Sequence, residues 1–432
     1  MKNTGAMKMY LALAALLAIA EIVLLSFSNG SLPISGLILF VMFYALAFTV
    51  QRTEKLKGLS FTFQIFAFVS LTLYFPQMFT DWGFNTNSLI VPSIQVIMFG
   101  MGTKLSFTDF ARELSKPFKV IIATVMCYTL MPLIALLIIK VYHFPPEVAA
   151  GIILLGVGPA GAASNVMTYL AKGNLALSMT VTTVTTLISP LATPFLMKLF
   201  AGQLIEVDTI GMMISILNML FIPVFAGIII NKILYGNLPW TKKNANISIM
   251  GVISFIVGFV LIFIPFPAIL KSLKTGLILI SWAITIVSVT VIVVRRTNGP
   301  QNWMDIVLPK LSLGAIMLYI VIVAAHNKAT LLSIGPALFI ATIAHNLLGY
   351  ISGYSLSRAF GFSEKDSRAI TMEVGTKNAG LAVGLAYDVL KSQAAALAPL
   401  IFGTWMNISA SSLATFWSQH EPREKLIKEE KV

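Results

Sequence analysis

The sequence is short of the residue types on which soluble enzymes and metal proteins depend. It has one cysteine, Cys127, four scattered histidines and only 17 acidic residues among 432. A single cysteine excludes an intrachain disulfide and a cysteine-based metal cluster. The chain also lacks a glycine-rich nucleotide loop and a Ser-His-Asp set, so it predicts neither an ATP-driven pump nor an enzyme.

Charge is scarce as well, because charged residues make up 11% of the chain and hydrophobic residues 57%, with a mean hydropathy of +0.87. A soluble domain of this length could not bury so many apolar side chains. A helix needs about 20 apolar residues to cross a bilayer. The sequence therefore predicts an all-α polytopic membrane protein with about 14 transmembrane helices in the lipid bilayer. These are 9–27, 33–51, 58–80, 83–103, 120–139, 148–171, 174–197, 209–231, 246–266, 275–294, 311–327, 330–357, 369–387 and 393–417.

The net charge of +13 comes from basic residues that are spread along the chain. They form no groove with interleaved aromatic side chains, so we predict no nucleic-acid partner. Loops rich in lysine and arginine stay in the cytoplasm, and such loops alternate here with basic-poor ones, apart from Lys271 and Lys274. The pattern predicts a cell (inner) membrane protein with both termini in the cytoplasm. The basic groups are Arg52/Lys55/Lys57, Lys104/Arg112/Lys116/Lys119, Lys232/Lys242/Lys243, Arg295/Arg296/Lys310 and Arg358/Lys365/Arg368.

Glu373 and Lys377 lie four residues apart in the middle of a predicted membrane helix. An ionisable group at this depth costs a few kcal/mol and commonly marks a transport path. On a continuous helix the two side chains could touch, but Gly375 and Gly380 allow the helix to break, which makes that pairing less certain. A lysine can also extend to the membrane interface, although about ten residues separate Lys377 from the charges on either side. We expect the function to centre here.

A second predicted membrane helix is interrupted by three glycines and a proline within 156–161, followed by Ser164 and Asn165. Half-helix N-termini suit anions, while freed carbonyls and hydroxyl side chains suit Na⁺. The next helix supplies hydroxyls that include Ser178 and Thr182, although small and hydroxyl residues also simply let helices approach closely. Two interrupted helices, one in each half, indicate an inverted-repeat transporter whose site lies where the two breaks cross.

Five motifs surround these breaks in a fixed order. They are Phe-Gly-Met-Gly-Thr-Lys-Leu (99–105), Pro-Ala-Gly-Ala-Ala-Ser-Asn-Val-Met-Thr-Tyr-Leu-Ala-Lys-Gly-Asn (159–174), His-Asn-Leu-Leu-Gly-Tyr (345–350), Glu-Val-Gly-Thr-Lys-Asn-Ala-Gly-Leu (373–381) and Trp-Met-Asn-Ile-Ser (405–409). Together they resemble the bile acid:sodium symporter family over about 58–235 and 309–418. The resemblance implies ten helices, divided into a core domain and a panel domain, that move an organic anion with Na⁺.

The resemblance also implies which ions bind. Sodium is the only ion it implies, and no cofactor is expected. The family's second sodium site uses the shared glutamate, backbone carbonyls and two glutamines, and those glutamine positions are Lys377 and Cys127 here. A thiol is a poor ligand for a hard ion, so we expect the Lys377 ammonium to replace the second sodium ion. Proton coupling through Glu373 and Lys377 is the alternative. The first sodium site maps onto Ser164, Asn165, Ser178, Thr182 and Glu373.

The substrate that the resemblance implies is a small organic anion. The usual Pro-Gly-Gly-Thr reads Pro-Ala-Gly-Ala at 159–162, and the histidine before the last-helix asparagine is Met406. Both changes make the pocket less polar, so no particular substrate of the family is carried over. Asn378 and Asn407 either bind the substrate or join helices. The expected substrate-binding residues are Gly161, Ala162, Asn378, Met406 and Asn407.

Two helical hairpins lie outside the resemblance, at 1–57 and 236–308, and both adjoin panel helices. We expect them to extend the panel. The predicted panel helices are 58–103, 209–235 and 309–327, the core helices are 115–201 and 330–418, and 419–432 is a charged cytoplasmic tail. The sequence as a whole predicts a sodium-coupled importer of a small organic anion, with a proton-coupled transporter or antiporter as the alternative. A sensor or membrane-embedded enzyme would need an output domain or catalytic set that the chain lacks.

Overall fold

The computed structural model describes residues 4–27, 33–53, 59–103, 117–235, 239–267, 270–300 and 302–422. In these ranges the chain is helical and forms no named strand; two isolated backbone bridges are the sole extended pairings. Several predictions fall outside the described residues. They concern the basic residues Lys55, Lys57, Lys104, Arg112 and Lys116, and the tail from residue 423.

Helices occupy all fourteen segments that the sequence predicts. Within the described ranges, nine helices are long and apolar enough to cross a membrane, as a polytopic membrane protein requires. Two predicted spans are each divided into a pair of shorter helices, at the two glycine-containing breaks. The helices of the first half are α1 (Thr4–Phe27), α2 (Pro33–Gln51), α3 (Ser60–Tyr74), α4 (Gln77–Thr80), η2 (Thr86–Leu89), α5 (Ile90–Gly102), α7 (Pro117–Tyr142), α8 (Pro146–Val157), α9 (Ala163–Leu170) and α10 (Leu175–Ala201).

The second half begins with a helix that changes its winding, since the π-helical turn η3 joins α11 to α12 without a break. Its later helices alternate between long spans and the second broken pair. They are α11 (Thr209–Ile216), η3 (Leu217–Phe221), α12 (Ile222–Tyr235), η4 (Pro239–Lys242), α13 (Asn244–Phe263), α14 (Lys271–Arg296), α15 (Trp303–His326), α16 (Lys328–Ala359), α17 (Glu364–Gly375), α18 (Ala379–Asp388), η6 (Ala394–Ala396) and α19 (Leu397–Ser418).

Several basic residues of the predicted cytoplasmic loops lie inside helices, as Lys119 does in α7 and Lys310 in α15. Arg358 lies in the last turn of α16, and Arg368 lies inside α17, where it is 1% exposed. The reason is that Ser363 caps α17 early, its side chain accepting from Asp366 N at 3.2 Å. Such a cap satisfies a free N–H at the first turn and favours helix from that point.

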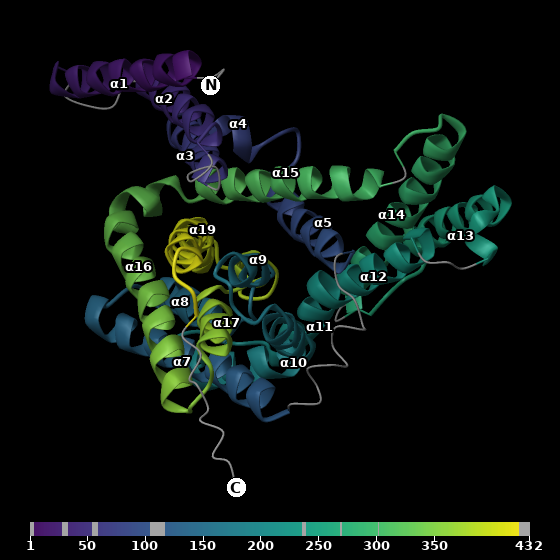
Figure 1. Cartoon of the computed structure of the whole chain (residues 1–432). Coiled ribbons are helices and arrows are strands. Elements are labelled where there is room, and N and C mark those ends of the chain that lie inside the picture. Colours follow the sequence, from purple (N-terminus) through teal and green to yellow (C-terminus); the bar gives the residue numbers. More distant parts are fainter. Residues whose placement is uncertain are drawn as a thin grey trace, which may run out of the picture.

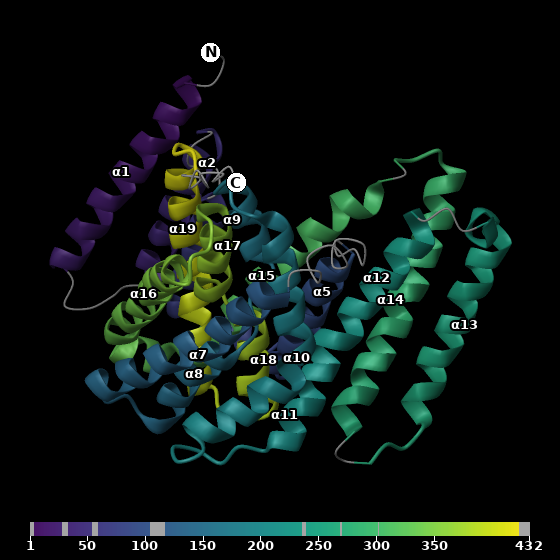
Figure 2. The same cartoon turned by 60° about the horizontal axis from the view of Figure 1, so that its bottom comes forward.

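The helices form two packed groups (Figures 1 and 2). In one group α16 packs against α7, α17 and α19, and α10 packs against α7, α8, α9 and α17. In the other group α5 packs against α12 and α15. The groups meet where α18 contacts α5 and α11, and where α19 contacts α3 and α15.

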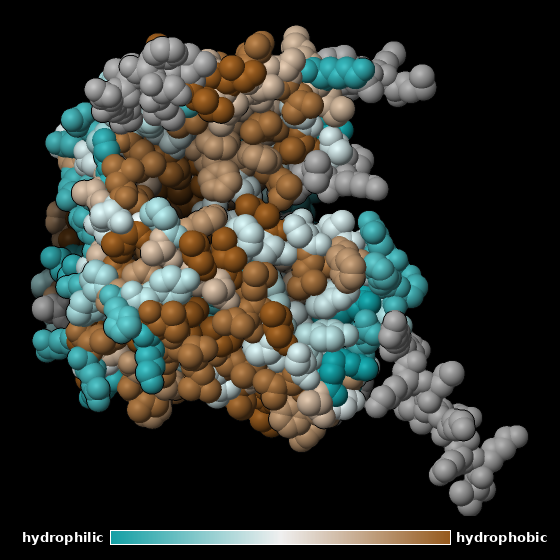
Figure 3. All heavy atoms as spheres, turned by 90° about the vertical axis from the view of Figure 1, so that its left-hand side faces the viewer, coloured by the Kyte–Doolittle hydropathy of each residue, from teal (hydrophilic) through white to brown (hydrophobic). Residues whose placement is uncertain are grey.

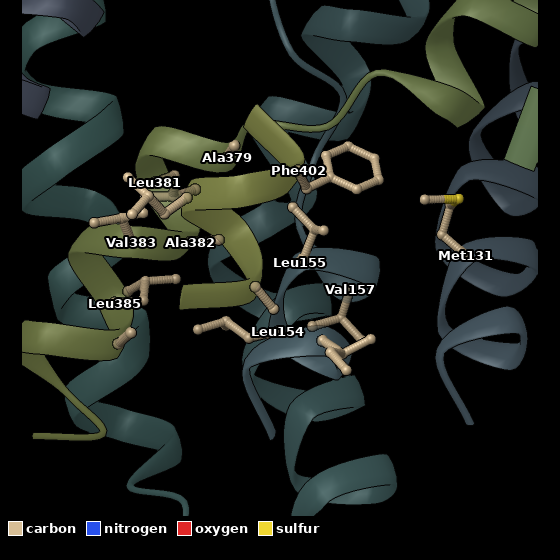
Figure 4. Packing of buried hydrophobic residues seen from close by; sticks show 14 of the residues in the cluster. Met131, Leu154, Leu155, Val157, Ala379, Leu381, Ala382, Val383, Leu385 and Phe402 are labelled. Atoms are coloured by element: carbon tan, nitrogen blue, oxygen red, sulfur yellow. The ribbon is translucent and has the colours of Figure 1, made fainter. Parts of the chain in front are cut away.

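The hydrophobic core of the first group surrounds α8, whose residues from Val148 to Val157 are all buried. A helix that is apolar on every side is one that its neighbours cover completely. Figure 4 shows Leu154 and Leu155 close to the apolar side chains of α18, with Phe402 of α19 nearby. A Cβ on Gly151 would lie 2.1 Å from Ala395 O. This close approach fixes α8, and therefore the first break, against η6.

The hairpins α1–α2 and α13–α14 lie at opposite ends of the molecule (Figure 1). α1 packs on α2 and α2 on α3, while α13 packs on α14 and α14 on α12 and η3. Much of the outer surface is apolar, and Figure 3 shows hydrophobic side chains over the middle of the α16 side with hydrophilic ones toward its lateral edges. That distribution matches a surface that faces lipid between two aqueous layers.

Candidate ion and substrate site

The structure brings the two broken helices together at their breaks. Ala160 and Lys377 form an isolated antiparallel bridge, Gly161 N donates to Thr376 O at 2.9 Å, and Asn378 N donates to Pro159 O at 3.0 Å. Broken helices leave backbone groups unpaired, which is costly away from water, and here each break satisfies the other. A Cβ at Gly161 would lie 2.7 Å from Lys377 O, so the crossing needs glycine there.

A buried asparagine from a third helix supports the second break. Asn346 of α16 is fully buried, and its Nδ2 donates to Gly375 O, the last carbonyl of α17, at 2.8 Å. Ser409 Oγ donates to Asn346 Oδ1 at 2.6 Å, which fixes the amide orientation. The sequence analysis assigned Asn346 no role, although it lies in the motif at 345–350. Its place in that motif was the one sequence feature that could have indicated a role.

The five residues expected at the first sodium site lie in one buried cluster around Glu373, which is itself fully buried. Ser164 Oγ and Ser178 Oγ donate to Glu373 Oε1, and Thr182 Oγ1 lies 2.9 and 2.8 Å from the two carboxylate oxygens. Asn165 Oδ1 lies 2.9 Å from Ser178 Oγ and 3.2 Å from Thr182 Oγ1, as an alternative acceptor for either hydroxyl. α9, α10 and α17 thus supply hydroxyl, amide and carboxylate oxygens to one small volume.

The chemistry of this cluster suits a hard cation. Each hydroxyl carries one proton and two lone pairs, so it can donate to a neighbour while it offers a lone pair to an ion. Ser164 has two acceptors for its one proton, because its Oγ lies 2.8 Å from Gly161 O and also reaches Glu373 Oε1. Among the described residues, no group of three or more histidine, cysteine or acidic side chains could hold a metal ion. The oxygen set is therefore of the kind that Na⁺, rather than a transition metal, prefers.

Lys377 is also fully buried, and it meets backbone oxygens. Its Nζ donates to Cys127 O at 2.7 Å and to Gly158 O at 3.0 Å, and it lies 5.7 Å from the centre of the Tyr128 ring. Gly158 is the residue that ends α8, so its carbonyl is freed by the first break. Tyr128 is held in turn by donating to Thr185 O at 2.7 Å.

Glu373 and Lys377 form no ion pair within the described part of the chain, because the break turns the backbone between them. Cys127 meets Lys377 through its backbone oxygen and not through its side chain. The sequence analysis missed Gly158 O, Cys127 O and Tyr128. Backbone carbonyls leave no mark in a sequence, so only the freed end of α8 could have suggested them.

The expected substrate-binding residues lie around the same crossing, at the half-helix N-termini and on α19. Ala162 precedes α9, and Asn378 caps α18 by accepting from Leu381 N at 3.1 Å. Asn378 Nδ2 also meets Met98 Sδ of α5 at 3.7 Å. On α19, Met406 is 9% exposed, and Asn407 Nδ2 donates to Gly403 O at 2.8 Å within its own helix. A Cβ on Gly403 would lie 2.8 Å from the Cβ of Ala379, the first residue of α18. Met406 and Asn407 follow Gly403 by about one turn of α19.

Comparison with known proteins finds relatives that are all described as sodium-dependent transporters or cotransporters. A family model described as the sodium bile acid symporter family matches residues 91–276. A sodium-dependent transporter of Bacillus subtilis, YocS, is 32% identical over 86% of this chain and 94% of its own length. The chain belongs to the bile acid:sodium symporter family. Members described as probable sodium/metabolite cotransporters BASS1, from the chloroplasts of Arabidopsis thaliana and Oryza sativa, are each 27% identical over 78% of this chain and cover 69% and 67% of their own lengths. The symporter family consists of transporters, not enzymes.

Proposed function

We propose that the chain is a sodium-coupled secondary transporter that takes up a small organic anion across the cell (inner) membrane. The observation that carries this proposal is the buried cluster in which Ser164, Asn165, Ser178, Thr182 and Glu373 present oxygens from three helices. One carboxylate among neutral oxygens balances one monovalent cation, and the oxygens come from the half-helices α9 and α17 and the continuous helix α10, which a movement of the protein could separate. Family membership and the sodium-dependent relatives support the same ion.

The second part of the proposal concerns Lys377, which replaces a second sodium ion. Its ammonium meets Gly158 O at the freed end of α8 and Cys127 O of α7. A helix C-terminus favours positive charge, and carbonyl oxygens are ligands that a sodium ion would also use. A protein-borne cation at this place lowers the number of coupling ions by one.

The substrate site lies next to these cations. The first turns of α9 and α18 both begin at the crossing, after Ala162 and Asn378. Half-helix N-termini carry partial positive charge and suit an anionic group. The anion would therefore meet the two N-termini, with Gly161, Ala162, Asn378, Met406 and Asn407 lining its site.

The same proposal assigns the helices. Fourteen of them cross the membrane, the two broken pairs belong to inverted repeats in a core domain, and both termini face the cytoplasm. The hairpins at 1–57 and 236–308 extend the panel. Their packing supports this assignment, because α2 contacts α3 and α14 contacts α12, and these partners are predicted panel helices.

The test is uptake into proteoliposomes that contain the purified full chain, with Na⁺ and pH gradients imposed separately. A panel of radiolabelled mono- and dicarboxylates provides the substrates, and equilibrium binding of ²²Na⁺ to the detergent-solubilised chain is measured alongside. Uptake driven by the Na⁺ gradient alone supports the proposal. Uptake driven only by the pH gradient, with no ²²Na⁺ binding, would favour the proton-coupled alternative, for which Glu373 and Lys377 supply fully buried ionisable groups at the crossing.

A further inference from the structure

A second polar cavity lies away from the crossing, where α16 and α19 end and α17 begins. Its volume is about 560 Å³, within the range of roughly 300–1,000 Å³ that small-molecule sites occupy. α16, α17 and α19 pack against one another here (Figures 1 and 2). The cavity is lined by Tyr354, Arg358, Glu364, Arg368, Phe416, Trp417, Gln419, His420 and Glu421.

Arg368 is the fixed element of this cavity. It is 1% exposed, and its Nη1 donates to Ala171 O, Trp417 O and His420 O at 2.8, 3.1 and 3.1 Å. Nη2 donates to Glu364 Oε1 at 2.8 Å. Its Nε, however, is buried and has no hydrogen-bond partner among the described residues. A buried donor without a partner is destabilising, so a ligand oxygen in the cavity would stabilise it.

Arg358 supplies a second guanidinium on the wall. Its Nη1 donates to Phe362 O at 2.6 Å, and within the described chain it forms no ion pair with a carboxylate. A guanidinium has five N–H donors in a planar fork that matches phosphate. The Arg358 side chain therefore keeps donors for an oxyanion, in the cavity that Arg368 also lines.

The cavity carries both signs of charge. Glu364 pairs with Arg368, and Glu421, whose side chain is 80% exposed, pairs with Lys172 across the rim. Two arginines and two glutamates among the lining residues balance one another. A headgroup that carries a phosphate and an ammonium complements this arrangement better than a purely anionic one.

The cavity also opens onto an apolar surface. Ile351, Tyr354 and Arg358 share one face of α16 by their i, i+3, i+7 spacing, and Ile351 is 61% exposed. Phe416 of α19, on the cavity wall, is 57% exposed. Tyrosine and tryptophan are typical of the membrane interface, and the Tyr354 and Trp417 rings lie 5.7 Å apart here. A ligand headed by a polar group would continue along Ile351 and Phe416 as a hydrocarbon chain.

We propose that this cavity binds the headgroup of phosphatidylethanolamine, with the phosphate at Arg358 and Arg368 and the ammonium toward Glu364 and Glu421. The acyl chains lie along Ile351 and Phe416. The site has a structural consequence, because α17 continues from Arg368 to Glu373 and Arg368 also holds the end of α9 through Ala171 O. The lipid would thus stabilise the two half-helices that carry the Glu373 cluster.

The test is native mass spectrometry of the purified full chain in detergent, titrated with phosphatidylethanolamine, phosphatidylglycerol or water-soluble glycerophosphoethanolamine. We expect one tightly bound phosphatidylethanolamine. Arg358→Gln should weaken its binding by about tenfold or more, since a charge-assisted hydrogen bond contributes about 1.5–3 kcal/mol. Arg296→Gln, which changes an exposed arginine at the end of α14, should leave binding unchanged. Melting temperatures of both variants check that they fold.

Glu421→Gln provides an independent variant, because this side chain is exposed and its loss should not affect folding. It should reduce the preference for phosphatidylethanolamine over phosphatidylglycerol by about twofold to fivefold, the effect of one exposed ion pair. Equal affinity of the unchanged chain for the two lipids would overturn the zwitterion assignment. Equal affinity for glycerophosphoethanolamine would make the site one for soluble phosphate esters, and unchanged lipid binding in Arg358→Gln would place the lipid elsewhere.

Discussion

Glu373 and Lys377 lie four residues apart and are both fully buried, yet the protein satisfies their charges in different ways. Glu373 meets side-chain hydroxyls from α9 and α10, whereas Lys377 meets backbone carbonyls of α7 and α8. A hydroxyl can donate or accept, but a carbonyl can only accept. The first group can therefore change its hydrogen bonds when a cation arrives. The second is built for a cation that is always present.

The largest expected effect comes from Glu373→Gln, which removes the negative charge and keeps the shape. Without that charge a cation in the cluster would have only neutral oxygens in a buried site, so ²²Na⁺ binding and coupled uptake should both be lost. Glu147→Gln, at the exposed first turn of α8, is the matched control and should bind normally. Sodium-driven uptake at the parent's rate in Glu373→Gln would remove Glu373 from the mechanism.

Lys377→Gln addresses the other half of the comparison. The change removes the resident ammonium and leaves Gly158 O and Cys127 O facing an amide oxygen, a set that can hold Na⁺. We expect one more bound Na⁺ per chain and a steeper sodium dependence of uptake. Lys377→Met offers no ligand and should lose transport, since the Gly158 and Cys127 carbonyls then lack a cation.

The extra sodium ion expected in Lys377→Gln has a control variant and a result that would contradict it. Lys198→Gln, at the exposed end of α10, should keep the parent's ²²Na⁺ stoichiometry and its sodium dependence. If Lys377→Gln matches the parent as well, then Lys377 is not a substitute for a sodium ion, and the contrast between a fixed and an exchangeable cation is wrong.

A smaller effect is expected from Thr182→Ala, which removes the hydroxyl that touches both carboxylate oxygens of Glu373. The loss of one ligand should raise the Na⁺ concentration for half-maximal binding by about tenfold. Thr183→Ala is a close control, because this neighbouring hydroxyl donates only to Met179 O of its own helix, at 2.8 Å. An equal sodium affinity in the two variants would leave the Glu373 cluster without a role in ion binding.

The sequence predicted the parts of this site that depend on side-chain type. The breaks were visible because glycines interrupt apolar runs at 156–161 and 375–380, with a proline in the first, and Ser164, Asn165 and Glu373 belong to the motifs at 159–174 and 373–381. The partners of Lys377 could not be predicted, since a backbone carbonyl is present at every residue and only the fold selects Gly158 and Cys127.

Arg368 illustrates a different limit. In the sequence it is one of three basic residues between two apolar spans, which is the pattern of a cytoplasmic loop. In the structure it is buried and binds three carbonyls from the ends of α9 and α19. Charge spacing indicates which side of a membrane a segment faces, but it does not reveal whether a basic side chain points to water or into the protein. That depends on how three helix ends converge.

The smallest effect on ion binding is expected from deletion of residues 1–51, which removes α1 and α2. α2 approaches α3 closely, since a Cβ on Gly36 would lie 2.5 Å from Tyr74 Cβ, so the melting temperature should fall. The ²²Na⁺ affinity should stay within about twofold, because the Glu373 cluster involves neither helix.

Glu21 of α1 is the residue that could contradict this expectation. It is 5% exposed, and both its carboxylate oxygens lack a hydrogen-bond partner among the described residues. Glu21→Gln in the full chain separates the two cases. A folded Glu21→Gln protein with altered sodium or pH dependence of uptake would show that the first hairpin takes part in transport.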